Sequence, residues 1–198
     1  MILMKKREKP PVKSFIKQTL IPHVNYEIVT ADPAVGIIYV VNNFISGHVR
    51  LLGRKGGAYP HKYLEMIESI FGKDDNTIEV CSGPIKGCFS VDINPRHTPC
   101  LIEDGQVMDH IPDNIFSRWR CDPPYNKETA QKMYNCEMPS IGKLLKAGAR
   151  VLKPNSLMFL LCNQNYQHCP KGVKRIGLIL ITIIPNNEIR ALNIYLKL

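Results

Sequence analysis

The sequence is poor in the features that would place a protein in a membrane, in an oxidising compartment or around a metal ion. Its longest apolar run lies within residues 176–184, far short of the roughly 20 apolar residues that a membrane-spanning helix needs. The first residues contain no apolar stretch of signal-peptide length, so we expect a soluble, cytoplasmic protein with no membrane partner. The seven cysteines form no C-x-x-C pair and the six histidines show no ligand spacing. We therefore expect reduced cysteines, four of them in or beside apolar segments, and no metal site.

Acidic residues are scarce in the first third of the chain. Residues 1–62 hold ten Lys/Arg and three acids, whereas the other 136 residues hold sixteen and fourteen. A basic segment ahead of a near-neutral body suits an anionic polymer, because phosphate contacts add affinity whatever the sequence. It suits a solubilising tail as well. We expect residues 1–58 to form a basic N-terminal arm and cover segment, with an apolar part at 36–45 of undecided structure, and residues 59–198 to form the folded domain.

From residue 59 onward, short apolar segments alternate with loops in the pattern of an α/β protein. Apolar spacing predicts a helix over 60–71, and later segments predict helices over 127–134 and 140–152. Strands are predicted at 77–82, 88–93, 99–103, 116–121 and 156–162, followed by a hairpin of 176–184 and 189–196. Five strands with crossovers and a terminal hairpin predict a mostly parallel sheet that ends in an antiparallel hairpin.

The segment Asp122-Pro123-Pro124-Tyr125, at the end of a predicted strand, is the most informative motif. Its two prolines fix φ and remove two backbone donors, so the segment is stiff and its carbonyls are left unpaired by neighbours. A carboxylate beside such a carbonyl offers two acceptors to one NH2 group, and the tyrosine offers a flat face. The segment therefore predicts a receptor for a planar group with an exocyclic amine, although a turn that closes the strand would have a similar composition.

This tetrapeptide resembles the catalytic motif of the amino-group methyltransferases, which use S-adenosylmethionine (SAM) to methylate adenine N6 or cytosine N4. The resemblance is to the adenine-N6 DNA type, in a compact form without a target-recognition domain. It implies a Rossmann-like SAM methyltransferase sheet in residues 59–198. It also implies that Asp122 and the Pro123 carbonyl accept the N–H groups of the target amine, which frees the lone pair for in-line attack on the SAM methyl group. Pro124, Tyr125 and Asn126 would contact the base, with Tyr125 stacked on it.

The same resemblance implies a cofactor site built from strand ends. Gly83 would form the sharp turn of the first SAM motif, although Ile85 stands where the family usually has a second glycine. Asp92 would bridge the ribose hydroxyls, and Asp104 would accept a hydrogen bond from the adenine amine, with Asp109 as a rival for that role. The expected cofactor contacts are Glu79, Cys81, Gly83, Asp92, Ile93, Asp104 and Gly105.

Taken together, these motifs predict methyl transfer from SAM to an exocyclic amine of a nucleic-acid base, with adenine N6 in DNA preferred over RNA. The base would have to be flipped out or single-stranded, and residues 126–139 would form a lid over it. Because little sequence follows the motif, target recognition would fall to the basic N-terminal segment or to a partner protein. Three alternatives stay open: an RNA base, a protein glutamine amide, and a non-catalytic nucleic-acid-binding module with a decayed cofactor site. Cytosine N4 fits less well, since those enzymes commonly carry Ser in place of Asp122.

Overall fold

The structure is a computed structural model that describes residues 37–41, 44–53 and 59–198. Of the basic arm and cover segment predicted for residues 1–58, residues 1–36, 42–43 and 54–58 lie outside these ranges. None of the helices within them is long and apolar enough to cross a membrane.

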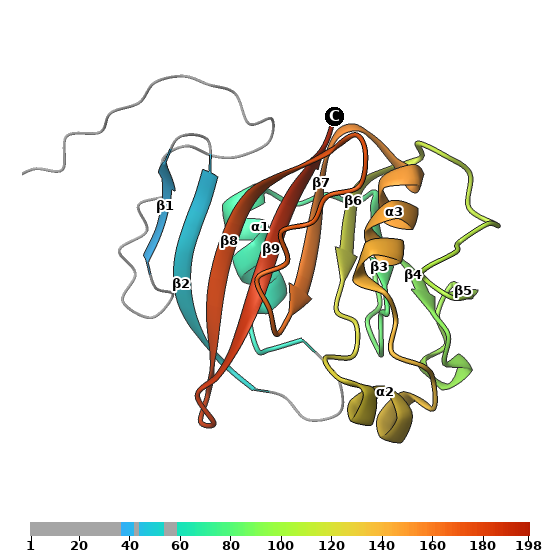
Figure 1. The fold of residues 1–198 in the computed structure, drawn as a ribbon, viewed down its shortest axis with the longest axis horizontal. Coiled ribbons are helices and arrows are strands. Elements are labelled where there is room, and N and C mark those ends of the chain that lie inside the picture. The colour runs from blue at the N-terminus through green and yellow to red at the C-terminus, as the bar shows by residue number, and fades with distance from the viewer. Residues whose placement is uncertain (1–36, 42–43, 54–58) are drawn as a thin grey trace, which may run out of the picture.

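In the described residues, one sheet of nine strands has the order β1-β2-β8-β9-β7-β6-β3-β4-β5 (Figure 1). The strands from β3 to β7 pair in parallel, and β9 enters antiparallel between β7 and β8. This confirms the predicted Rossmann-like α/β class, mostly parallel with a C-terminal antiparallel hairpin. The strands are β1 (Ile37–Val41), β2 (Phe44–Leu52), β3 (Thr77–Val80), β4 (Phe89–Asp92), β5 (Leu101–Ile102), β6 (Phe116–Cys121), β7 (Leu152–Cys162), β8 (Val173–Ile184) and β9 (Glu188–Lys197).

The sequence leaves the structure of the apolar segment at 36–45 undecided; its described residues, 37–41 and 44–45, belong to β1 and to the start of β2, which pair antiparallel at one edge of this sheet. β2 pairs in parallel with β8, which places Ile45 opposite Gly177. A Cβ on Gly177 would lie 2.8 Å from the Ile45 Cβ, so glycine is needed for the two strands to approach this closely. Residues 44–52 therefore share a sheet and a core with the domain that was predicted to begin at residue 59.

Two helices cover opposite faces of the sheet, as Figure 1 shows: α1 (Tyr63–Phe71) and α3 (Ile141–Val151). Side chains along β7 alternate between the two faces, as expected for a strand with both faces buried. Phe159 and Leu161 pack in the apolar cluster that contains α1, whereas Met158 and Leu160 pack in the cluster that contains α3. The third helix, α2 (Lys127–Tyr134), lies at the edge of the sheet where β6 ends.

The elements from residue 59 onward lie close to their predicted bounds, with one clear difference in β7. This strand begins at Leu152, directly after α3, rather than at residue 156. The pairing of β6 with β7 is irregular between Phe116 and Arg118, and Asn155 adopts φ +62°. This irregularity lets the strand continue past Pro154, which has no N–H to donate to a neighbour.

Candidate active site

A cavity of about 320 Å³ opens where the parallel strands β3, β4, β5 and β6 end. Its size falls within the range of small-molecule sites, roughly 300–1,000 Å³, and its place is the usual ligand site of an open α/β sheet. The structure brings most of the predicted cofactor residues to this cavity, together with two residues of the tetrapeptide. They are Cys81, Gly83, Asp92, Ile93, Asp104, Gly105, Asp122 and Pro124.

Asp92 connects the end of β4 to the glycine turn after β3. Its Oδ2 accepts a hydrogen bond of 2.8 Å from the Gly83 N–H and lies 3.3 Å from Nδ1 of His97, and its Oδ1 accepts one of 2.8 Å from the Asn94 N–H. Gly83 has φ +53°, a conformation that favours glycine. The carboxylate therefore fixes the turn at the cavity wall, and its oxygens keep capacity for further donors.

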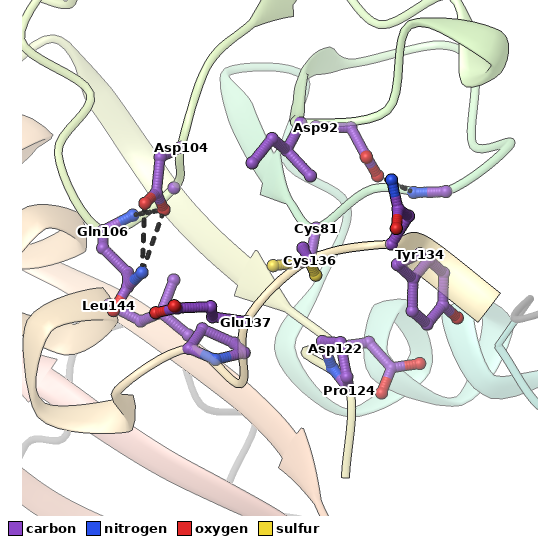
Figure 2. A pocket seen from close by; sticks show the side chains of 15 residues that line it. Cys81, Asp92, Asp104, Gln106, Asp122, Pro124, Tyr134, Cys136, Glu137 and Leu144 are labelled. Carbon is purple, nitrogen blue, oxygen red and sulfur yellow. Dashed lines mark hydrogen bonds between the residues drawn. The ribbon is translucent and has the colours of Figure 1, made fainter. Parts of the chain in front are cut away.

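On the other side of the cavity, Asp104 is held by Gln106 (Figure 2). Both carboxylate oxygens accept from Nε2 of Gln106, at 3.2 and 3.0 Å, and Gln106 Oε1 accepts a hydrogen bond of 2.8 Å from the Ser140 N–H. Gly105 lies so close to β3 that a Cβ there would be 2.3 Å from Cγ1 of Val80. Gln106 was not predicted, because no motif marks it. It links Asp104 to the start of α3.

The tetrapeptide follows β6 and carries Asp122 to the same cavity as Gly83. The Tyr125 hydroxyl donates a hydrogen bond to Oδ1 of Asp122. Arg190 Nη1 donates to the Tyr125 hydroxyl over 2.9 Å, and its guanidinium lies 4.7 Å from the centre of the Tyr125 ring. Neither Pro123 nor Tyr125 lines the cavity, and Asn126 caps α2 by accepting from the Thr129 N–H.

Arg190 is a residue that sequence reasoning missed. β9 runs antiparallel to β7 and pairs Cys162 with Ala191, so the start of β9 lies beside the carboxyl end of β7. This places Arg190 next to Tyr125, although 65 residues separate them along the chain. Only the sheet order makes them neighbours, and no local signal in the sequence predicts the contact.

The carboxyl group of Asp122 has an unusual environment. Burial raises its pKa to about 7, against the lowering effects of the Tyr125 hydrogen bond and the Arg190 charge. Burial also raises the pKa of Tyr134, and the charges of Asp122 and Asp92 add to that effect. Near neutral pH the Asp122 carboxyl is thus divided between acid and carboxylate, while Tyr134 keeps its proton.

The connection from α2 to α3 closes part of the cavity. Tyr134, Cys136, Glu137 and Pro139 line it, and Asn135 ends α2 with φ +52°. Figure 2 shows Tyr134 on the side of Asp122, and Cys136 beside Cys81. The range 126–139 was predicted as a lid over a base. Its second half is part of the cavity that holds the predicted cofactor residues.

Glu79 does not line the cavity and instead forms a buried ion pair beneath it. Its Oε2 lies 2.7 Å from Nε of Arg120 on the neighbouring strand β6, and Tyr59 donates to its Oε1. Burial raises the pKa of Glu79, and Arg120 counteracts this. The second basic residue of β6, Arg118, donates to the carbonyls of Gly72 and Phe71 over 2.8 and 3.0 Å, at the end of α1. Both arginines in this apolar strand thus have structural partners.

No family model and no curated protein matches this chain. Among solved structures, it is similar to TrmN from Thermus thermophilus, at 12% identity and a TM-score of 0.48, over 68% of this chain and 48% of that one. The chain thus spans about half the length of TrmN. It is also similar to the antibiotic-resistance methyltransferase Kmr, at 12% identity and a TM-score of 0.41, over 75% of this chain and 97% of that one. A third similar structure is a 16S rRNA (adenine(1408)-N(1))-methyltransferase from Catenulisporales acidiphilia, at 10% identity and a TM-score of 0.40, over 75% and 98%.

Proposed function

We propose that this protein is a SAM-dependent methyltransferase that acts on the exocyclic amine of a nucleic-acid base, with adenine N6 as the acceptor. The observation that carries the proposal is that one cavity holds both the Asp122 carboxylate and the strand-end residues Gly83, Asp92 and Asp104. The Asp122 carboxylate is suited to hold an amine, and the strand-end residues are suited to hold a nucleoside. The resemblance of the tetrapeptide favours DNA as the polymer, and an RNA base would present the same amine to the site.

The residues of the cavity fit the adenosyl part of SAM. Ile93 is an apolar residue that is 50% exposed at the cavity, and Leu144 lines the same space from α3. These side chains suit the faces of an adenine ring, while the Asp92 carboxylate suits ribose hydroxyls and the Asp104–Gln106 pair suits the polar edge of the base. When bound, SAM would supply the methyl group from its sulfonium. The chain itself would have to place the acceptor.

Asp122 would place the acceptor by taking a hydrogen bond from the target amine. An amine attached to an aromatic ring is a weak nucleophile because its lone pair is conjugated with the ring. The carboxylate would draw the nitrogen toward tetrahedral geometry and stabilise the charge that develops on it. The Pro123 carbonyl, the second acceptor that the resemblance implies, belongs to a residue that does not line the cavity, so the amine would have to reach past the cavity wall to meet it. The Tyr125 hydroxyl already donates to Oδ1, so the amine would use Oδ2 or displace the tyrosine.

The proposal is tested by two measurements on the purified chain. Calorimetry with SAM should show binding, and tritiated methyl transfer to separate pools of DNA, RNA and protein should label a nucleic acid. Nucleoside mass analysis of that pool should then show N6-methyladenine. Label in the protein pool, or a chain that gives no heat with SAM, would remove the proposal and favour the glutamine acceptor or the decayed-site alternative respectively.

Tyr125 does not line the cavity and has Arg190 over one face of its ring, so a base would have to stack on the opposite face, while the hydroxyl acts on Asp122. Tyr125→Ala should raise KM for nucleic acid about tenfold or more, since stacking on an aromatic residue contributes roughly 1–3 kcal/mol per base. Tyr125→Phe should keep KM, and because the hydroxyl lowers the pKa of Asp122 it should retain most of the activity only at a pH above a raised pH–rate midpoint. Steady-state kinetics of the two variants separate these effects, and a phenylalanine variant as impaired as the alanine variant would show that the ring does not stack.

Activity should rise with pH because Asp122 must be a carboxylate to accept the amine. With a pKa of about 7, log kcat/KM should increase by about one per pH unit below pH 7 and level off above it. Arg190 lowers that pKa, so Arg190→Gln should move the midpoint to higher pH. The pH–rate profile measures this, and Lys174→Gln, an exposed change on β8, should leave the midpoint where it is. A midpoint unmoved by Arg190→Gln would assign Arg190 a merely structural role.

A further inference from the structure

A second concave surface, which we name the α3 groove, lies between α3, the connection from β7 to β8, and the C-terminal residues Lys197 and Leu198. It encloses about 650 Å³. Its charged side chains are all basic, and the described residues that line it include no Asp or Glu; the α-carboxylate of Leu198 is the one acidic group among them. The basic residues are Lys143, Lys146, Arg150, His168, Lys171 and Lys197.

Two of these cations have structural partners. Arg150 forms an ion pair of 2.6 Å with Asp113 and donates to the Met108 carbonyl. Lys197 donates to the Asn114 side chain over 2.7 Å. These contacts tie the end of α3 and the end of β9 to the loop that precedes β6, so the two residues stabilise the fold in addition to shaping the surface.

The other three lysines have no such role. Lys143 and Lys146 lie on α3 and Lys171 lies in the facing loop, and all three side chains are exposed. None of them forms an ion pair or a hydrogen bond with a residue that the structure describes. Lys143, Lys146 and Arg150 recur at helical spacing and so share one side of α3. Like charges gathered in one concave surface repel one another, and an anionic ligand would remove that cost.

The groove begins beside the candidate active site. Pro139 and Leu144 line the cavity that holds Asp122, while Ser140 and Gly142, in the same turn of chain, line the groove. α3 then runs from the edge of the sheet that carries α2 to the edge where the chain ends (Figure 1). Its 11 residues extend about 16 Å at 1.5 Å per residue. A strand with one base in the cavity would therefore meet several successive cations along α3.

We propose that the α3 groove binds the phosphate backbone of the single-stranded nucleic acid whose base enters the active site. The inference rests on the proposed function for the identity of the polyanion, and on the basic lining and its position for the site. A single strand fits because a base inside a duplex cannot reach a carboxylate at the wall of a cavity without leaving the stack. The contacts would be to phosphates and would carry no sequence information.

The test compares two charge-matched pairs of substitutions in the full chain. Lys146→Gln with Lys171→Gln removes two cations from the groove, and Lys73→Gln with Lys174→Gln removes two exposed cations outside it. Fluorescence anisotropy with a labelled single-stranded oligonucleotide, as RNA and as DNA, gives the affinity across a salt series. The groove pair should bind about tenfold more weakly at low salt, and the slope of log K against log salt should become shallower by about 1.4, since each phosphate contact on a single strand contributes about 0.7. The control pair should change affinity less than about twofold.

Equal losses in the two pairs, or an unchanged affinity in the groove pair, would overturn the proposal. So would a groove pair that binds the oligonucleotide normally and loses binding to vesicles of anionic phospholipid. Calorimetry with SAM separates the two proposals, because the groove pair should bind SAM like the unmodified chain. If the unmodified chain does not bind SAM but the groove pair still loses affinity for the oligonucleotide, the proposed methyltransferase function is wrong. The proposal that the α3 groove binds a nucleic-acid backbone would still stand.

Discussion

Asp122→Ala should reduce kcat for methyl transfer by at least about 10²- to 10³-fold, the usual cost of removing one preorganised group that stabilises transition-state charge. The carboxylate is the acceptor that the structure places at the cavity from β6. SAM affinity should change by less than about twofold, because the proposed cofactor contacts are made by other strand ends. Single-turnover methylation and calorimetry measure the two quantities. Turnover near that of the unmodified chain would remove Asp122 from the mechanism.

Asp122→Asn is the control for folding. The pKa of Asp122 is raised from its ordinary value of 3.8 to about 7, so the folded state binds the proton more tightly than the unfolded state does. The contribution of Asp122 to the free energy of unfolding is therefore largest below about pH 4, where the group is protonated in both states, and it is lost as the pH rises through about 7. The asparagine variant should be inactive and yet have a higher Tm than the unmodified chain at pH 8. A lower Tm would indicate that the carboxylate is needed for folding.

Glu79→Ala should lower the free energy of unfolding by about 3–5 kcal/mol, because it leaves a buried cation without its partner. Glu79 is fully buried, Arg120 is 6% exposed, and their side chains meet at 2.7 Å. The Tyr59 hydroxyl also loses its acceptor. Urea denaturation measures the loss.

The double change Glu79→Leu with Arg120→Leu should be much less destabilising than Glu79→Ala, since it removes both buried charges and keeps apolar volume. Glu79→Gln keeps an acceptor for Tyr59, so its loss in the free energy of unfolding should lie between those of Glu79→Ala and the double variant. The structure indicates a buried, desolvated ion pair. A loss of less than about 1 kcal/mol in the free energy of unfolding for Glu79→Ala, which is the range of an exposed pair, would contradict this.

The residues at the strand ends show which parts of the candidate site can be predicted from local sequence. Gly83, Asp92, Asp104 and Asp122 each follow an apolar segment, and parallel strands bring their ends to one edge, so their meeting at one cavity follows from pattern and topology. Glu79, inside β3, was also expected to contact the cofactor, but it does not line the cavity, because its side chain pairs with Arg120 on the neighbouring strand β6. Alternation along a strand decides such cases, and a strand buried on both faces does not reveal which face holds the ligand.

By itself, the sequence determined the fold class, most of the element bounds and the order of strand-end acids, because these depend on hydrophobic period, turn residues and stiff prolines close together in the chain. Tertiary structure alone decided the hairpin of β1 and β2 beside β8, the contact of Arg190 with Tyr125, the link from Asp104 through Gln106 to α3, and the collection of lysines in the α3 groove. Each of these joins segments distant in sequence. Their meeting is fixed by sheet order and by burial on opposite faces, which no local pattern encodes.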